Sequence, residues 1–245
     1  MLISELKKMV VGANKELPAR DLVKYSWGNV SAIDRENGVV IIKPVGIPYD
    51  ELTVDNISVV DMDSKILEGP YNPSVDLPIH MVLYKEFPQI GAIVHTHSTY
   101  ATMMAQLGIS IPCFGTTHAD YFYGEIPCTR PLTQEETGEA YEHETGKAIV
   151  EKFNEMNLSP IDMPGVLSCC HGPFTWGRDV WETVHKTVVL EEIAKMAWGV
   201  LCINPMAKPV PQYLLDRHFR RKHGPEAYFT NDDYGKGMVE VKKHE

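Results

Sequence analysis

The sequence predicts an α/β protein with three layers, α/β/α, in which helices cover a mainly antiparallel central sheet. Strand-like segments alternate with amphipathic helices, but no regular strand–helix–strand repeat is present. Many connections are short, and no Gly/Ser linker, low-complexity tract or internal repeat divides the chain. These observations fit one domain with an antiparallel sheet better than a doubly wound parallel sheet.

The N-terminal half predicts two helices and three strands. Its first residues carry an amphipathic stripe and lack the apolar run of a signal peptide. Two segments rich in Val and Ile are bounded by Gly, Pro or Asp, as is typical of strands, and an apolar run ends in His-Thr-His. The predicted elements are helix 1–17, strands 39–44 and 57–62, helix 76–87 and strand 90–97.

The C-terminal half predicts four helices and one strand. Gly108 ends the first of these helices. Asp179 can cap the longest helix, which stops before Pro205. The predicted elements are helices 99–107 and 135–156, strand 166–170, and helices 180–203 and 214–222.

Composition and charge exclude several classes of function. The formal net charge is −10 and the pI is about 5.5, which argues against nucleic acid or an anionic membrane as the main partner. The most apolar long stretch, residues 180–203, contains six Glu, Lys and His residues, so a membrane span is not expected. Five cysteines without a CxxC pair indicate buried, reduced thiols in a cytoplasmic protein. Nucleotide, nicotinamide and serine-hydrolase motifs are also absent from the sequence.

Three histidines follow apolar strands and predict a metal site. His95 and His97 are two residues apart in a predicted strand, so both imidazoles point to the same face. His171 follows a second apolar strand. If the two strands are neighbours, three neutral nitrogens converge, which is a usual set for catalytic zinc with an open position. Asp76, near the start of a predicted helix, could add a carboxylate oxygen.

Each of these residues also has an ordinary structural interpretation. A His-x-His pair alone is a weak signal, and its weight comes from the third histidine at another strand end. Cys169 and Cys170 adjoin His171 and could be proposed as ligands, but adjacent residues of a strand face opposite ways. We therefore interpret them as core thiols.

Five stretches of the chain resemble one known family. They are residues 27–44, 93–102, 115–131, 164–177 and 214–228. They resemble the epimerase branch of the class II, metal-dependent sugar-phosphate aldolase and epimerase superfamily, which contains the L-ribulose-5-phosphate 4-epimerases. The Ala-Asp-Tyr-Phe-Tyr-Gly segment at 119–124 carries the most weight, because it separates this branch from the aldolases. The resemblance implies a domain over residues 1–229, followed by a C-terminal extension over 230–245.

The resemblance also implies an assembly and a set of site residues. It implies a homotetramer of fourfold symmetry with active sites between neighbouring subunits. His218 and Arg221 then belong to a C-terminal element that reaches into the neighbouring subunit's site, and Asp120 is one catalytic acid/base. The implied metal ligands are Asp76, His95, His97 and His171. The implied phosphate-pocket residues are Asn29, Lys43, Gly46 and Ser74.

The implied reaction converts L-ribulose 5-phosphate to D-xylulose 5-phosphate. The proton at C4 is not acidic, so inversion proceeds by breaking and remaking the C3–C4 bond through an enediolate that a divalent metal stabilises. Proton transfer at the C4 hydroxyl then needs one acid/base group on each face. The sequence does not choose the ion, because three histidines and a carboxylate accept zinc, manganese or cobalt.

Three positions depart from the family pattern. Val45 and Val75 stand where the family usually has serines, so two hydroxyl donors to phosphate are missing, and Phe229 stands where it has its second acid/base tyrosine. Tyr228, next to that position, or Tyr234 could take the tyrosine's role. Two alternatives follow. One is an aldolase or an epimerase of a different, non-phosphorylated ketose, and the other is a sugar sensor or scaffold that binds metal without catalysis.

Overall fold

The computed structural model describes residues 2–224 and residue 227. Its helices and strands, in chain order, are α1 (Ile3–Ala19), β1 (Gly28–Asp34), β2 (Val39–Ile42), β3 (Ser58–Asp61), β4 (Ile66–Glu68), α2 (Leu77–Glu86), β5 (Ala92–Thr96), α3 (Thr99–Leu107), α4 (Thr116–Ala119), α5 (Tyr141–Glu155), β6 (Gly165–Ser168), β7 (Gly172–Gly177), α6 (Val180–Ile203) and α7 (Gln212–Arg220). The C-terminal extension and Tyr228, Phe229 and Tyr234 lie outside the described residues, so the domain boundary at residue 229 stays a prediction.

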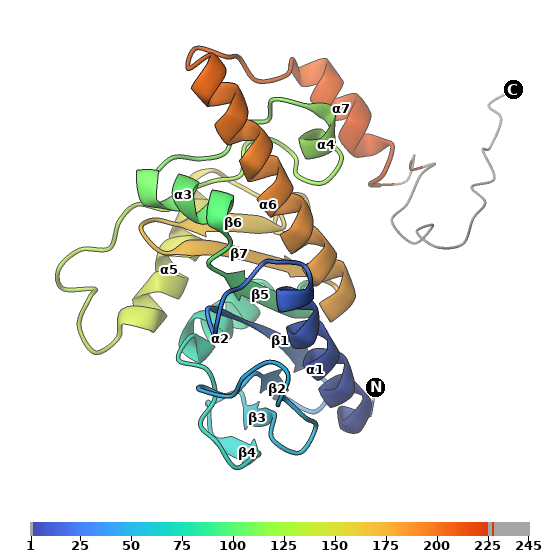
Figure 1. The fold of residues 1–245 in the computed structure, drawn as a ribbon, viewed down its shortest axis with the longest axis vertical. Helices are drawn as coiled ribbons and strands as arrows, with labels where there is room; N and C mark the ends of the chain where they lie inside the picture. The colour runs from blue at the N-terminus through green and yellow to red at the C-terminus, as the bar shows by residue number, and fades with distance from the viewer. Residues whose placement is uncertain (1, 225–226, 228–245) are drawn as a thin grey trace, which may run out of the picture.

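One antiparallel sheet forms the centre of the fold. Its strand order is β4-β3-β2-β1-β5-β7-β6, and each pairing between neighbours is antiparallel. The long helix α6 runs alongside the sheet from the β5 region toward α3 and α4 (Figure 1). The predicted mixture of helices with a mainly antiparallel sheet is therefore confirmed.

Alternate residues of the sheet face two different hydrophobic cores. In β2, Val39 and Ile41 pack into a core with α1, whereas Val40 and Ile42 pack into a core with α2 and α5. This period of two is expected of a strand that is buried on both faces. Helix α6 contributes to both cores, which explains why its apolar residues are not confined to one stripe. Helices thus cover the two faces of the sheet, as the sequence predicts.

Several predicted boundaries differ from those of the structure, and three strands were missed. The predicted helix 135–156 begins only at Tyr141, because Glu136 closes a preceding turn by bonding both the Thr133 amide (2.8 Å) and Arg130 (2.7 Å). Strand 166–170 ends at Ser168, and helix 214–222 is shifted to Gln212–Arg220. The missed strands are β1, β4 and β7. In β1, Gly, Asn, Ser and Asp have low strand propensity, so only pairing on both sides makes this segment a strand.

None of the helices in the described part of the chain is both long enough and apolar enough to span a membrane. Helix α6 is the longest of them, and charged residues interrupt its apolar sequence. Asp179 caps it as predicted, because its side chain accepts hydrogen bonds from the Trp181 and Glu182 amides at 2.9 Å.

A partly buried ion pair fastens the first turns of α6. Lys186 Nζ lies 2.8 Å from a carboxylate oxygen of Glu182, and Arg178 Nε lies 2.9 Å from the other. Burial alone would raise the pKa of Glu182, but the neighbouring Lys186 and Arg178 outweigh it and hold this pKa at about 2, below its ordinary value of 4.5. The pair therefore stabilises the fold fully above pH 4.5, and this contribution is lost as the pH falls toward 2.

We predict that Glu182→Gln lowers the free energy of unfolding by about 3 kcal/mol at pH 7, because buried Lys186 loses its counter-charge. Denaturant unfolding between pH 2 and pH 7 measures the effect, and the difference from the parent protein should shrink toward pH 2. Glu155→Gln is the matched control, because Glu155 pairs with Lys152 on an exposed surface and its loss should cost under about 1 kcal/mol. Equal losses in the two variants would contradict the prediction.

Candidate active site

Strand β5 holds the first two histidines in a rigid setting. It lies between β1 and β7, with His95 opposite both Asn29 and Phe174. The His95 ring is buried and stacks on Phe174 with 4.2 Å between ring centroids. His97 follows the strand, and its backbone amide donates to the Trp27 carbonyl at 3.2 Å. Both imidazoles therefore project from the same end of the sheet.

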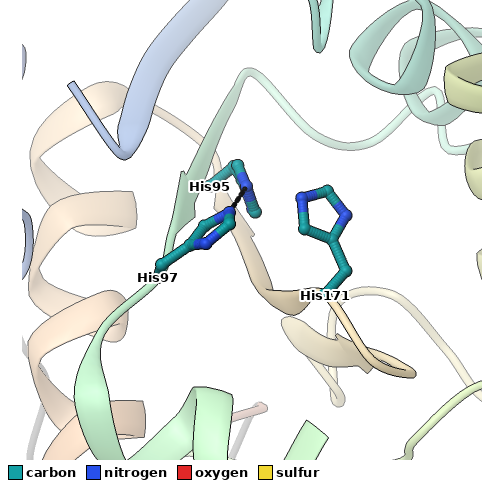
Figure 2. Close-up of side chains that lie close together, drawn as sticks. All are labelled: His95, His97 and His171. Atoms are coloured by element: carbon teal, nitrogen blue, oxygen red, sulfur yellow. Dashed lines mark hydrogen bonds between the residues drawn. The ribbon is translucent and has the colours of Figure 1, made fainter. Parts of the chain in front are cut away.

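The third histidine comes from the turn between β6 and β7. His171 lies opposite the end of β5, and Figure 2 shows the three rings around a common space. One ring nitrogen from each of His95, His97 and His171 lies within 4.8 Å of the others. The turn can come this close because Gly172 has no side chain. A Cβ there would lie 2.7 Å from the Thr96 carbonyl oxygen.

The protonation state of these rings suits a divalent metal. Burial lowers the pKa of His95 and of His171 to about 3, and it also lowers the pKa of His97, so all three are neutral at pH 7. His95 Nδ1 donates to the Pro173 carbonyl at 3.0 Å, which leaves the lone pair on Nε2, 3.1 Å from His97 Nε2. The buried Nδ1 of His171 has no hydrogen-bond partner among the residues that the structure describes. Three convergent imidazoles with available lone pairs fit a metal ion such as zinc.

Asp76 lies beside this group but outside its compact core. Its carboxylate accepts a hydrogen bond from Asn29 Nδ2 at 2.7 Å and one from the Ser74 hydroxyl at 3.4 Å. Its charge acts on His97 and His171 in the direction that raises their pKa, against the larger effect of burial. Among the described residues, the cluster of ligating atoms within 4.8 Å contains the three histidines and not Asp76.

The predicted phosphate-pocket residues gather next to Asp76. Asn29 Nδ2 also donates to Ser74 Oγ at 3.2 Å, and the Ser74 amide donates to the Lys43 carbonyl at 3.0 Å. Lys43 is buried, its ammonium lies 5.0 Å from the centre of the Tyr49 ring, and burial lowers its pKa. Gly46 has a φ of 75°, which suits a turn that only glycine adopts without strain.

Asp120 forms the centre of a second group. At the C-terminal end of α4, its carboxylate accepts two hydrogen bonds from Arg221 (2.7 and 3.0 Å) and lies 3.0 Å from His218 Nδ1. Burial alone would raise its pKa, but the bonds from Arg221 and His218 and the charge of Lys222 outweigh it and lower the pKa. Asp120 is therefore ionised near neutral pH.

Side chains for which the sequence predicted no role fasten helix α7 to the segment around α4. Tyr123 donates a 2.5 Å hydrogen bond to Asp216, and the Tyr123 and Phe219 rings are in contact. Lys222 Nζ lies 3.5 Å from the Asp120 carboxylate, and His223 Nε2 donates to the Asp120 carbonyl at 3.0 Å. In the sequence, Lys222 and His223 could have been predicted as site residues only from their place beside Arg221 in the 214–228 stretch.

The structure thus brings the predicted residues together in two groups. The histidines, with Asp76, Asn29, Lys43 and Ser74, lie around the end of β5, and Gly46 lies in the turn that follows β2. Asp120 lies with His218 and Arg221 at the packed pair α4 and α7. The predicted acid/base Tyr228 lies outside the described residues.

Comparison with known proteins places this arrangement in a family. Residues 8–198 match the family described as Class II Aldolase and Adducin N-terminal domain. The chain belongs to the class II aldolase family. The L-ribulose-5-phosphate 4-epimerases UlaF of Salmonella paratyphi C and Salmonella choleraesuis are each 52% identical to it over 227 residues, which cover 93% of this chain and 99% of each relative.

Solved structures of class II aldolases share the fold. An L-fuculose 1-phosphate aldolase superposes with a TM-score of 0.76 at 24% identity, covering 90% of this chain and 97% of its own. The L-fuculose 1-phosphate aldolase of Glaciozyma antarctica has a TM-score of 0.73 at 18% identity, with 91% and 84% covered. At these identities the likeness concerns the fold alone. It agrees with the predicted three-layer arrangement.

We predict that Gly172→Ala weakens zinc binding about tenfold or more, because the added Cβ forces the start of β7 away from Thr96 and moves His171. Competition with a chromogenic zinc chelator measures the affinity, and circular dichroism checks the fold. Gly199→Ala on α6 is the control, since a Cβ there meets open space. Unchanged zinc affinity in a folded Gly172→Ala protein would show that the turn does not set the site.

Proposed function

We propose that this chain is a metal-dependent epimerase that interconverts L-ribulose 5-phosphate and D-xylulose 5-phosphate. The observation that supports it most is the cluster of three neutral, convergent histidines in a chain 52% identical to named L-ribulose-5-phosphate 4-epimerases over almost their whole length. Reaction at C4 requires the C3–C4 bond to break and re-form, since the C4 proton is not acidic. A Lewis acid next to the ketose is what such a reaction needs.

The histidines would hold the metal, with Asp76 completing the ligand set. A divalent ion there, zinc in our proposal with manganese or cobalt as alternatives, would supply electrostatic stabilisation for the negative charge that develops on the ketose oxygens. The chain prepares this site by holding Asp76 through Asn29 and His95 through the Pro173 carbonyl. These contacts orient the donor atoms before any ion arrives.

Asp120 would exchange the proton of the C4 hydroxyl on one face of the substrate. Its ionised state, maintained by Arg221 and His218, suits the role of a base. His218 Nδ1 is hydrogen-bonded to the Asp120 carboxylate, so His218 could accept that proton from Asp120 or return it. For the opposite face, our proposal remains Tyr228.

Phosphate binding would rest on the pocket around Ser74 and Lys43. The Asn29 amide and the Ser74 hydroxyl offer hydrogen bonds, and Lys43 contributes its charge. Gly46, in a turn with a positive φ, leaves its backbone exposed for an anion to approach. Arg221, which the resemblance assigns to an element that reaches a neighbouring subunit's site, is bonded through two of its nitrogens to Asp120. It would approach the substrate only together with that carboxylate.

Different elements carry the two groups, since β5 and the β6–β7 turn hold the histidines whereas α4 and α7 hold Asp120 and His218, and this supports sites shared between subunits. If Asp120, His218 and Arg221 serve a neighbour's histidine cluster, a homotetramer of fourfold symmetry completes each site. An assembly of this kind uses the same heterologous contact at every interface. We also propose a cytoplasmic location, in line with the five free cysteines.

A second candidate function is cleavage or epimerisation of a free ketose. Val45 and Val75 are exposed and flank the Lys43 and Ser74 pocket in sequence, where they offer no hydrogen bond to phosphate. Each missing bond to a charged oxygen is worth about 1.5–3 kcal/mol. The two candidates therefore differ in whether phosphate is required.

The test is NMR of the purified, zinc-loaded protein with L-ribulose 5-phosphate, L-ribulose and D-xylulose in separate samples. We expect the phosphopentulose to convert to its C4 epimer. His97→Asn should lower the rate at least about a thousandfold, since one ligand of the cluster is lost. His143→Asn, on an exposed face of α5, should retain the parent rate.

Turnover of a free ketose without turnover of the phosphate would replace this proposal with the second candidate. Release of a free aldehyde fragment would identify an aldolase. Absence of any turnover by folded, zinc-loaded protein would favour a binding role without catalysis.

Mixing two inactive variants tests the shared site. Subunits carrying His97→Asn and subunits carrying Asp120→Asn should each be inactive alone. After unfolding and refolding together, they should recover about one quarter of the parent activity, because that share of random neighbour pairs joins one intact histidine cluster to one intact Asp120. Native mass spectrometry confirms mixing. Mixed tetramers without recovered activity would contradict a site built from two subunits.

A further inference from the structure

Two neighbouring thiols occupy the turn between β6 and β7. Cys169 and Cys170 follow Ser168, the last residue of β6, and precede His171. Cys170 is exposed and Cys169 is half-buried. The interpretation of the pair as core thiols is therefore wrong for Cys170, because the strand ends before it and its φ is 62°.

The spacing of the two sulfurs suits a shared bonding partner. Cys169 Sγ lies 3.7 Å from Cys170 Sγ. A central atom that binds two sulfurs at about 2.3 Å, with a tetrahedral angle between the bonds, sets them about 3.8 Å apart. One atom can therefore bond both sulfurs while the turn keeps its observed conformation.

Backbone hydrogen bonds hold both cysteines in place. The Cys169 amide donates to Thr129 Oγ1 at 2.9 Å, and the Cys170 amide donates to the Ala105 carbonyl at 2.9 Å. Gly108 lies beside Cys169, and a Cβ there would be 3.4 Å from the Cys169 Sγ, so its missing side chain leaves space next to this sulfur. The turn thus presents two sulfurs at a fixed spacing before any ligand arrives, which lowers the cost of binding.

A disulfide within the pair is disfavoured by the backbone. Consecutive Cα atoms are about 3.8 Å apart, whereas unstrained disulfides span roughly 4.4–6.8 Å between Cα atoms. A direct bond between Cys169 and Cys170 would therefore be strained and easily reduced. The pair stays as two thiols, and both sulfurs remain available to an external partner.

The number of sulfurs selects the class of that partner. Structural zinc sites use four protein ligands. In the described part of the chain, the three histidines are the one group of three or more convergent ligating side chains, so Cys169 and Cys170 offer two ligands. A trivalent arsenic atom that already carries one organic group needs two further bonds. Thiol sulfur is also the donor that soft centres prefer.

We propose that Cys169 and Cys170 form a bidentate binding site for a monosubstituted trivalent arsenical. The exposed Cys170 sulfur bonds to arsenic first, and the Cys169 sulfur then closes the ring. The two thiol protons leave with the oxygen of the arsenical as water, and arsenic stays trivalent. Because the second bond forms within one molecule, the pair binds far more tightly than a single thiol. Binding at this turn does not depend on the proposed function.

The experiment incubates the full-length, reduced protein with phenylarsine oxide in the presence of a monothiol. An alkylating agent then labels the remaining thiols. We expect one arsenical per chain in the intact mass and two of the five thiols protected from labelling. Peptide mapping should place the protection at Cys169 and Cys170. Excess monothiol should leave the arsenical bound, whereas a soluble dithiol should remove it.

Variants locate the site, and competition with the soluble dithiol measures the affinity of each. Cys169→Ser and Cys170→Ser should each bind the arsenical about a hundredfold or more weakly, because one sulfur remains. Cys128→Ala removes a buried thiol, and Cys202→Ser removes an exposed thiol on α6, so both are controls that should bind as the parent protein does. His97→Asn should also bind normally, since the histidines take no part. Circular dichroism checks that each variant is folded.

Four results would overturn the proposal. They are five labelled thiols after treatment, protection of a pair that includes Cys128, unchanged affinity in folded Cys169→Ser and Cys170→Ser, and release of the arsenical by a monothiol alone. Absence of epimerase turnover in the untreated protein would count against the proposed function alone, since the mass and labelling measurements do not depend on turnover.

Discussion

The antiparallel pairing of β5 with β1 on one side and β7 on the other is the constraint on which the site depends. This pairing sets Asn29 opposite His95 and brings the β6–β7 turn, with His171, to the end of β5. Both neighbours must approach closely, so each contributes a glycine at the contact. A Cβ on Gly28 would lie 2.6 Å from the His95 carbonyl oxygen, and one on Gly172 would lie 2.7 Å from that of Thr96. The register of these three strands thus determines how the three histidines are arranged.

The histidines are neutral, whereas Asp120 is negatively charged. The histidines lie where desolvation outweighs the charge of Asp76, so they stay neutral and keep lone pairs for a cation. Asp120 lies where bonds from Arg221 and His218 outweigh desolvation, so it stays negative. In the proposed function, one region would hold a metal ion and the other would exchange a proton. This division is what a reaction needs when charge develops on one oxygen while a proton leaves another.

The turn that carries His171 combines this chemistry with an unusual density of sulfur. The backbone of this turn is fixed by the hydrogen bond from the His171 amide to the Ser168 carbonyl and by that from the Cys169 amide to Thr129 Oγ1. Helix α7 is coupled to Asp120 in a comparable way, through Tyr123, Asp216 and Phe219. Both groups thus depend on the packing of a short segment at the end of the sheet.

The sequence by itself determined the fold class, the long helices α1 and α6, and the three histidines, because periodicity and strand-end position are local properties. It did not reveal strands β1 and β7, and the Gly, Asn, Ser and Asp residues of β1 form a strand only through pairing with β2 and β5. It named Asp120, His218 and Arg221 through the family resemblance, but their contact across α4 and α7 comes from tertiary packing. Tertiary structure also decided that Cys170 is exposed, so that its interpretation as a core thiol is wrong, and that the Cys169 amide bonds Thr129 Oγ1. These contacts join residues about 40 to 100 positions apart, a separation at which no local pattern in the chain records proximity.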